Sequence, residues 1–454
     1  MSQRPSVAII GAGPVGLAAA AHALERGHAP IVIEQGDEAG HAVRQWSHVR
    51  MFSPWRYNID RAAERLLERA GWNRPEPEAY PTGAELIDQY LSPLAHRTPL
   101  ERSIRLQSRV AAVTRKGFDK VRTAGRERAP FELGVARNGH IDTIETDAVI
   151  DASGTWFSPN PAGANGLAAP GEAENADRIA YGMPDVLADE RYAGKTVAVL
   201  GSGHSALGVL IDLARLAETA PGTRAVWLTR RADIATAFGG GANDQLAERG
   251  ALGTAFAGLV AAGHIQVEKG FRLSAIARSG DRLEIRAGTG CGCRKVLADE
   301  LVVATGFRPD LSYLRELRLA LDPALECPPA LAPLIDPNLH SCGTVRPHGA
   351  RELSQPEPGF YFAGMKSYGR APTFLMLTGY EQVRSIVADI AGDRKAAERV
   401  ELDLPETGVC SRPVAAVGAV ANGCCGGPAL ADAAACCRAD EDAKARGAAG
   451  CGCC

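Results

Sequence analysis

The chain has 454 residues, of which 46 % are hydrophobic and 23 % charged, and its formal net charge is −3. The length indicates two or three domains, and the small net charge gives no reason to expect a nucleic-acid partner or an anionic membrane surface. The chain starts without the layout of a signal peptide and contains no apolar run near the roughly 18 residues of a membrane-spanning helix, so we expect a cytoplasmic protein.

The segment 6–34 predicts a complete βαβ unit. The run "SVAII" predicts a buried strand, "GAGPVG" follows it, and an Ala-rich helix is expected from Val15 to Arg26 with Gly27 at its end. A second strand, "PIVIEQ", carries Glu34. The G-x-G-x-x-G spacing lets the backbone approach a pyrophosphate at the helix N-terminus, and the acidic residue accepts from a ribose hydroxyl. The alternative is a glycine-rich turn without a ligand. The predicted nucleotide contacts are Gly11, Gly13, Pro14, Gly16, Glu34 and Gln35.

A second copy of this motif begins at Lys195. "KTVAVL" predicts a strand, "GSGHSA" has the G-x-G-x-x-A spacing, and "LGVLIDLARLA" predicts an amphipathic helix. The next strand, "AVWLT", ends in an arginine pair, where an acidic residue would select the 2′-hydroxyl of NAD. Arginines suit the 2′-phosphate of NADPH, although the alternative is two solvated surface residues. The predicted NADPH contacts are Gly201, Ser202, Gly203, His204, Ser205, Arg230 and Arg231.

Two dinucleotide-binding units imply two nucleotides, of which one is expected to be a flavin. "DAVIDASGTWFSP" (147–159) and "DELVVATGFRPD" (299–310) each predict a buried strand and a small-residue turn, and they bracket the second unit as crossings between two domains. "GFYFAG" (359–364) predicts a last strand, followed by a helix that begins near Thr373. The basic stretch 115–130 is interpreted as a solvated hairpin. Further predicted FAD contacts are Ser153, Gly154, Gly306 and Gly364.

The predicted fold is therefore α/β, with two Rossmann-like dinucleotide-binding domains. The FAD-binding domain is discontinuous and comprises residues 1–158 and 300–395, and the NADPH-binding domain, 159–299, is inserted in it. Composition shifts to Ala, Gly and Cys after "ELDLPETG", which marks 405–454 as a Cys-rich C-terminal tail.

These motifs together resemble the two-dinucleotide-binding flavoproteins and, within them, the class B flavin monooxygenases. The resemblance covers residues 1–395 and rests on the two glycine motifs with Glu34 and Arg230, and on "DASGTW" and "ATGFRPD". The rival branch, the pyridine-nucleotide disulfide reductases, uses a redox cysteine pair near the flavin, but no cysteine occurs here before Cys291. Those reductases also have Asp after the last flavin strand, where this chain has Met365. One departure from the monooxygenases is "RIAYGMPDV", which stands where they have F-x-G-x-x-x-H.

A narrower resemblance is to the flavin monooxygenases of arsenic-resistance operons. It rests on "WSHVRMFSPWRYN", "GSGHSA", "LHSCGTVRPHGARELSQPEPGFYFAG" and "MKSYGRAPTFLMLTGYEQVRSI". The resemblance implies oxidation of trivalent arsenicals or antimonite to the pentavalent state. In the aromatic-rich stretch 45–58, we predict that Trp46 covers the isoalloxazine and that Asn58 hydrogen-bonds a flavin peroxide, which makes them the candidate catalytic residues. The alternative is a buried aromatic cluster under a long loop.

Seven of the 12 cysteines lie between Asn422 and Cys454. Thiols stay reduced in the cytoplasm, and soft thiolates are the ligands that trivalent arsenic and antimony select. Neighbouring cysteines bring donors to one ion at high effective concentration, whereas a zinc ribbon would need C-x2-C pairs. The alternatives are a zinc or copper(I) site and a passive tail. The predicted metalloid ligands are Cys424, Cys425, Cys436, Cys437, Cys451, Cys453 and Cys454, with Cys291, Cys293 and Cys342 as further candidates.

The expected chemistry follows from these parts. NADPH reduces FAD by hydride transfer, reduced flavin reacts with O2 to give a C4a-(hydro)peroxide, and that species donates oxygen to a lone pair on the metalloid. We therefore expect an NADPH- and FAD-dependent metalloid monooxygenase in which the tail collects the substrate. The alternatives are a monooxygenase of an organic amine or sulfide, an NADPH-dependent thiol or metal reductase, and an oxidase that releases H2O2.

Overall fold

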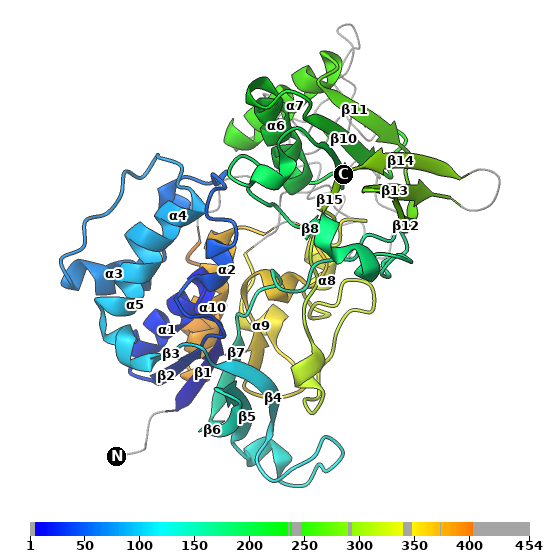
Figure 1. The fold of residues 1–454 in the computed structure, drawn as a ribbon. Coiled ribbons are helices and arrows are strands. Elements are labelled where there is room, and N and C mark those ends of the chain that lie inside the picture. Colours follow the sequence, from blue (N-terminus) through cyan, green and yellow to red (C-terminus); the bar gives the residue numbers. More distant parts are fainter. Residues whose placement is uncertain are drawn as a thin grey trace, which may run out of the picture.

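The computed structural model describes residues 5–234, 237, 247–288, 293–338, 347–372 and 374–402. Two five-stranded parallel sheets form the centres of two lobes, one coloured mainly blue and orange and the other mainly green in Figure 1. Helices cover one face of each sheet and a three-stranded antiparallel sheet covers the other. The α/β class with two dinucleotide-binding folds is thus confirmed, while the Cys-rich tail lies outside the described residues.

The first sheet has the strand order β16-β7-β1-β2-β3. Side chains of β1 are buried on both faces: Val7 and Ile9 pack on the helix side, and Ala8 and Ile10 pack on the antiparallel sheet. This two-sided burial explains why the strand is a continuous apolar run. The strands of the first sheet are β1 (Ser6–Ile10), β2 (Ala29–Ile33), β3 (Ile104–Arg105), β7 (Ala148–Asp151) and β16 (Phe360–Phe362).

Three helices cover one face of this sheet: α1 (Pro14–Glu25), α3 (Arg61–Arg69) and α10 (Met376–Ile390). Helix α1 ends one residue before the predicted boundary, and Gly27 follows it at φ +72°, which a glycine adopts without strain. No described helix is long and apolar enough to cross a membrane. The shorter helices are α2 (His41–Arg44), α4 (Gly83–Leu86), α5 (Ser92–His96), α8 (Ala332–Ile335), α9 (Ala350–Leu353) and α11 (Arg394–Glu398).

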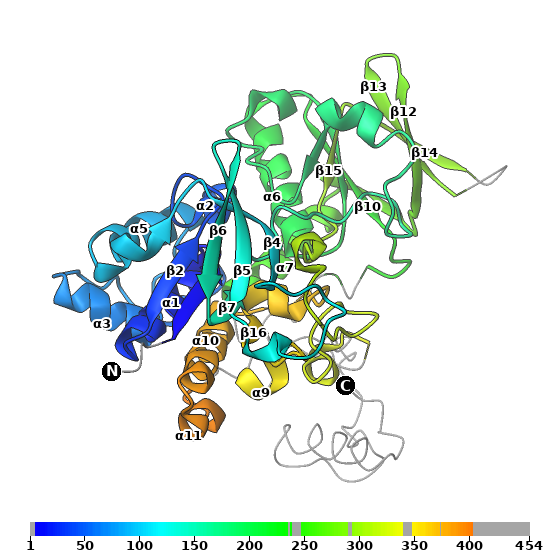
Figure 2. The same cartoon turned by 90° about the horizontal axis from the view of Figure 1, so that it is seen from below.

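The opposite face packs against the antiparallel strands β4 (Arg109–Arg115), β5 (Phe131–Arg137) and β6 (His140–Thr146), which lie in the same lobe in Figure 1 and Figure 2. The connection between β4 and β5 differs in part from the solvated hairpin that was predicted for 115–130. Arg115 and Arg126 are buried there, and each guanidinium lies 2.8 Å from one carboxylate oxygen of Glu357. The interpretation was wrong for these two residues because their partner lies more than 200 positions away in the sequence.

The second sheet has the order β11-β10-β9-β15-β8. Helices α6 (His204–Thr219) and α7 (Ala247–Ala261) belong to its lobe, and α6 packs on β9 and β10. Its parallel strands are β8 (Ile179–Tyr181), β9 (Thr196–Leu200), β10 (Arg224–Thr229), β11 (Ile265–Lys269) and β15 (Glu300–Val303). The antiparallel strands on the other face are β12 (Leu273–Ser279), β13 (Arg282–Ala287) and β14 (Arg294–Ala298).

The chain passes between the lobes twice, after β7 and after β15, and the two crossings run side by side. Pro159 and Phe307 form an isolated antiparallel bridge, and the N–H of Arg308 donates to the carbonyl of Ser158 at 2.9 Å. The rings of Trp156 and Phe307 stack with their centroids 4.8 Å apart. The second sheet is therefore contributed by a stretch that lies between β7 and β16 in the sequence, and the exact domain boundaries stay a prediction.

Candidate nucleotide-binding sites

The first glycine motif forms the turn between β1 and α1. Gly11 has φ +99°, and a Cβ there would lie 2.8 Å from the carbonyl oxygen of Ala152, so the position admits only glycine. A Cβ on Gly13 would meet nothing within 4 Å. Gly13 is also the N-cap of α1, where no side chain caps the helix and no acidic residue occupies the first turn. The N–H groups at this end therefore fit an anion such as a pyrophosphate.

Glu34 holds this turn from the end of β2. Its side chain is buried, and its two oxygens accept the N–H groups of Ala12 and Gly36, both at 2.8 Å. A carboxylate can accept about four hydrogen bonds, so acceptor capacity remains for ribose hydroxyls. The predicted contact Gln35 is exposed beside it, and Pro14 is the first residue of α1. These placements fit a dinucleotide, and the individual contacts stay predictions.

The second motif repeats this geometry between β9 and α6. Gly201 has φ +142°, and its Cβ would lie 2.2 Å from the carbonyl oxygen of Ala304, whereas a Cβ on Gly203 would again meet open space. Gly203 caps α6 without a side-chain hydrogen bond. Ser202 and Thr229 are joined through their hydroxyls at 2.7 Å. Because β9 and β10 are parallel neighbours, the exposed Arg230 and Arg231 lie at the same edge as the glycine turn.

Ser153 and Gly364, two of the other predicted FAD contacts, lie beside the first turn. Ser153 and Gly154 follow β7, and the Cα of Ser153 lies 2.9 Å from the place of a Cβ on Gly11. Gly364 follows β16, and a Cβ there would lie 3.3 Å from the side chain of Val15 in the first turn of α1. Gly306 lies in the crossing after β15, whose backbone pairs with the other crossing.

The aromatic-rich stretch 45–58 packs mainly on the first lobe and touches the second at one residue. The ring of Phe52 lies 5.2 Å from that of His204 at the start of α6, so this stretch reaches the second glycine motif. Trp46 is partly buried against the core of the first lobe. Asn58 is fully buried, and its amide exchanges two hydrogen bonds of 2.7 Å with Ser53. The catalytic roles given to Trp46 and Asn58 stay predictions, and in this arrangement the Asn58 amide is occupied within its own loop.

Four residues that the sequence did not single out as a group form a cluster at the carboxyl edge of the first sheet. The Lys366 ammonium lies 2.7 Å from Asp151 Oδ2, 3.1 Å from Ser153 Oγ and 2.5 Å from Tyr313 Oη. Of these, only Ser153 was predicted as a site residue. A lysine between the apolar strand "FYFAG" and a glycine was the available signal, since lysines are seldom buried unless paired.

The predicted metalloid ligands fall mostly outside the described residues, namely Cys291, Cys342 and the seven cysteines from Cys424 to Cys454. Cys293 is described and directly precedes β14 in the second lobe. Cys327 is fully buried in the core of the first lobe. Burial raises the pKa of its thiol to about 12. Within the described part of the chain, no group of three or more His, Cys, Asp or Glu side chains is arranged to hold a metal ion.

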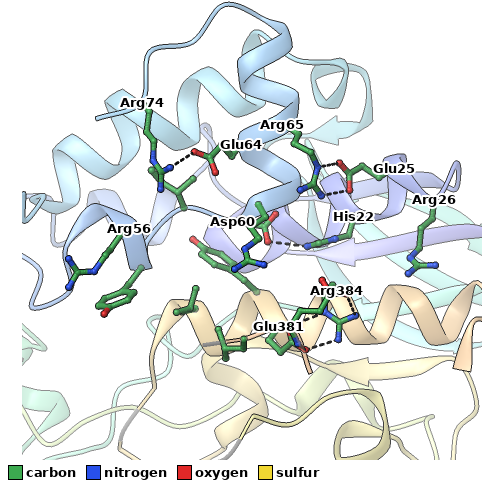
Figure 3. Close-up of a pocket in the computed structure, with 17 residues that line it drawn as sticks. His22, Glu25, Arg26, Arg56, Asp60, Glu64, Arg65, Arg74, Glu381 and Arg384 are labelled. Atoms are coloured by element: carbon green, nitrogen blue, oxygen red, sulfur yellow. Dashed lines mark hydrogen bonds and ion pairs between the residues drawn. The ribbon is translucent and has the colours of Figure 1, made fainter. Parts of the chain in front are cut away.

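A cavity of about 580 Å³ lies between α1, α3 and α10 (Figure 3). The residue of α1 that lines the cavity nearest to the glycine turn is His22. His22 lies roughly 12 Å along the helix from Pro14, at 1.5 Å per residue, so the cavity is separate from that turn. Charged side chains line it, and carboxylates engage most of its arginines, as the Arg65 pair with Glu25 illustrates. We therefore do not assign a nucleotide or the redox reaction to this cavity.

Comparison with known proteins places the chain among flavin enzymes. Residues 8–328 match the family described as pyridine nucleotide-disulphide oxidoreductase. Among curated proteins, the flavin-containing monooxygenase FMO GS-OX-like 2 of Arabidopsis thaliana is 26 % identical over 235 residues, covering 47 % of this chain and 48 % of the relative. Flavin-containing monooxygenase 1 of the dog is 26 % identical over 222 residues, covering 47 % and 38 %. The chain thus spans about half the length, or less, of these curated relatives.

Solved structures share the fold over most of the chain. A bacillithiol disulfide reductase of Bacillus cereus has a TM-score of 0.64 at 18 % identity, covering 86 % of this chain and 99 % of its own. An FAD-bound cadaverine monooxygenase of Erwinia amylovora has a TM-score of 0.60 at 14 % identity, covering 88 % and 98 %. At these identities the likeness concerns the fold alone. Its two glycine turns fit two dinucleotides, FAD and NADPH, and the chain belongs to the pyridine nucleotide-disulphide oxidoreductase family.

Proposed function

We propose that the protein is an NADPH- and FAD-dependent monooxygenase that oxidises trivalent arsenic or antimony species to the pentavalent state. The monooxygenase part is supported by curated relatives that are flavin-containing monooxygenases. It is also supported by the sequence, because no cysteine precedes Cys291, so the chain lacks the redox cysteine pair that disulfide reductases carry after the first glycine motif. The observation that supports a metalloid substrate is the composition of the tail, where seven cysteines lie within 33 residues, from Asn422 to Cys454.

Each glycine turn would bind one of the two nucleotides. The uncapped N-terminus of α1 would bind the FAD pyrophosphate, and Glu34 would accept from the ribose. The uncapped N-terminus of α6 would bind the NADPH pyrophosphate, with Arg230 at the 2′-phosphate. When bound, FAD supplies the hydride acceptor and the O2 chemistry, while the protein orients the two nucleotides and excludes water.

The metalloid substrate is argued from the chemistry of thiolates. Trivalent arsenic and antimony are soft centres with a lone pair, so they bind thiolates and accept an oxygen atom. The pairs Cys424-Cys425 and Cys436-Cys437 and the cluster Cys451 to Cys454 place several donors on short segments. A second thiolate on the same segment binds at high effective concentration, which suits the capture of a scarce ion.

The test is NADPH oxidation by the reduced, purified enzyme with and without methylarsenite or antimonite. O2 uptake and the oxidation state of the metalloid are followed in the same samples. We expect stimulated turnover and one pentavalent product for each NADPH consumed. Turnover that yields only H2O2, or no stimulation by either metalloid, would contradict the assignment. Stimulation by an organic sulfide or amine instead would identify a monooxygenase with another substrate.

A second candidate is an NADPH-dependent disulfide reductase, and the fold shared with the bacillithiol disulfide reductase favours it. Against it stands the position of the described thiols, since Cys327 is buried and Cys293 lies beside β14. This candidate predicts NADPH consumption with a low-molecular-weight disulfide in the absence of O2. A monooxygenase would show no sustained turnover under those conditions.

A further inference from the structure

Lys366 is a fully buried lysine beside the first glycine turn. It lies in the short 3-10 helix Gly364–Tyr368 that follows β16, and its side chain and that of Asp151 are both 0 % exposed. Removing an ammonium from water is unfavourable unless each of its donors finds a partner. We therefore expect the buried ammonium of Lys366 to have a role other than packing.

The hydrogen bonds around Lys366 form a closed set. The three donors of its ammonium meet Asp151, Ser153 and Tyr313. The hydroxyls of Tyr313 and Ser153 in turn donate to Asp151, each at 2.7 Å. Burial lowers the pKa of Lys366 below its ordinary value, and the Asp151 carboxylate opposes that shift. The ion pair is the state in which every donor of this cluster has an acceptor.

Two of the segments that the cluster joins pack directly on the glycine turn. Ser153 belongs to the turn after β7, and its Cα lies 2.9 Å from the place of a Cβ on Gly11. Gly364 lies two residues before Lys366, and a Cβ on it would lie 3.3 Å from the side chain of Val15 in the first turn of α1. Lys366 thus links the two walls between which the turn from Gly11 to Val15 is held.

The third segment is the crossing that returns from the second lobe. Tyr313 lies in the 3-10 helix Ser312–Leu314, which follows Phe307 and Arg308, the residues that pair with the outgoing crossing. Asp310, at the end of that crossing, also interacts electrostatically with Lys366. One ammonium therefore joins the end of β7, the segment after β16 and the end of the returning crossing.

We propose that Lys366 is a positioning residue for the FAD site, which holds these three segments in the places that shape the first glycine turn for the FAD pyrophosphate. The proposal goes beyond the monooxygenase function, because it concerns the binding of FAD and applies whatever the substrate is. A failed metalloid assay leaves it standing, and a normal metalloid assay does not establish it.

The test compares FAD dissociation from full-length holoenzymes, measured by the flavin fluorescence that appears on dilution. We expect Lys366→Met to raise the Kd for FAD by about tenfold or more, the equivalent of about 1.4 kcal/mol for each tenfold step. The matched control is Arg115→Met, which breaks the buried ion pair with Glu357. Glu357 precedes β16 and so lies at the opposite edge of the sheet from Gly364. This control is expected to change the Kd by less than about twofold.

Two further variants separate positioning from an unpaired buried charge. Asp151→Asn combined with Lys366→Met removes both charges, and we expect it to recover thermal stability without recovering FAD affinity. Tyr313→Phe removes a single hydroxyl, and we expect the Kd to rise about threefold even if Lys366→Met fails to fold. The proposal is overturned if FAD affinity returns together with stability in the double variant. It is equally overturned if Arg115→Met weakens FAD as much as Lys366→Met, or if Tyr313→Phe and Lys366→Met both bind FAD normally.

Discussion

Gly11 and Gly13 lie in the same turn but face different surroundings, and substitution should separate their roles. A Cβ on Gly11 would meet the carbonyl of Ala152 at 2.8 Å, at a φ of +99°. Gly11→Ala is therefore expected to lower the free energy of unfolding by at least about 1–3 kcal/mol, from backbone strain alone. Urea unfolding of the FAD-free protein measures this cost.

Gly13→Ala should behave in the opposite way. Its backbone has φ −75° and a Cβ there meets nothing within 4 Å, so stability should change by less than about 0.5 kcal/mol. The methyl group would instead occupy the space through which a pyrophosphate approaches, and we expect the Kd for FAD to rise by about tenfold or more. Unchanged FAD affinity in Gly13→Ala would show that the nucleotide does not approach this residue.

Cys327 should be the less reactive of the two described free thiols. Its pKa is raised to about 12 by burial, so at pH 8 only about one molecule in ten thousand carries the thiolate that reacts. We expect iodoacetamide at pH 8 to label Cys293 in the native protein and to leave Cys327 unlabelled until the protein is unfolded. Peptide mapping by mass spectrometry distinguishes the two. Equal labelling of both cysteines would contradict the inert role assigned to Cys327.

At the scale of elements, α3 depends on Asp60 at its N-terminus (Figure 3). One carboxylate oxygen accepts the N–H groups of Ala62 and Ala63 at 2.9 Å, and the other lies 3.0 Å from Nε2 of the buried His22 on α1. Asp60→Ala removes the cap and leaves His22 without this partner, at an expected cost of about 2–4 kcal/mol in unfolding free energy. Asp60→Asn should retain much of it, because asparagine also caps helices.

The control for that measurement is Asp88→Ala, which removes an exposed carboxylate paired with Arg44. Exposed ion pairs contribute little, so we expect a change below about 1 kcal/mol. An effect of Asp60→Ala as small as that of Asp88→Ala would mean that neither the cap nor the His22 contact stabilises this part of the first lobe.

The elements that the sequence predicted best are those whose signal is local. Strands β1 and β9 are continuous apolar runs followed at once by glycines, and the helix boundary at Glu25 was placed within one residue because Gly27 ends the pattern. The start of α10 was less accurate, since no capping residue precedes Met376 and the side chain of Leu375 makes no cap. Local chemistry thus predicted the fold class and both glycine turns.

What the sequence did not reveal depends on contacts between distant positions. The sequence indicated solvated side chains for Arg115 and Arg126, but both guanidinium groups hydrogen-bond to Glu357, which lies 242 and 231 residues away. Lys366 and Ser153 are 213 residues apart, and no pattern near either residue indicates the other. The metalloid ligands assigned to the tail stay predictions, because those cysteines lie outside the described residues.

At the scale of the whole molecule, the same segments join the lobes and position both glycine turns. In the first lobe the carbonyl of Ala152 lies against Gly11, and in the second the carbonyl of Ala304 lies against Gly201. Each of these alanines begins a crossing between the lobes, and the crossings pair with each other. A change in one crossing is therefore expected to reach both glycine turns, including the one beside the cluster around Lys366.

The role of the Cys-rich tail can be separated from this redox core by deletion. Removing residues 405–454 leaves the strands, helices and glycine turns of both lobes in place, so FAD affinity and basal NADPH oxidation should stay unchanged. If the tail collects the metalloid, the concentration that half-stimulates turnover should rise by about tenfold or more, since the local concentration of thiolates is lost. A full-length variant with all eight cysteines of residues 405–454 replaced by serine should match the deletion. Unchanged half-stimulation in both variants would make the tail incidental, and a defect in the deletion alone would assign its effect to something other than its thiols.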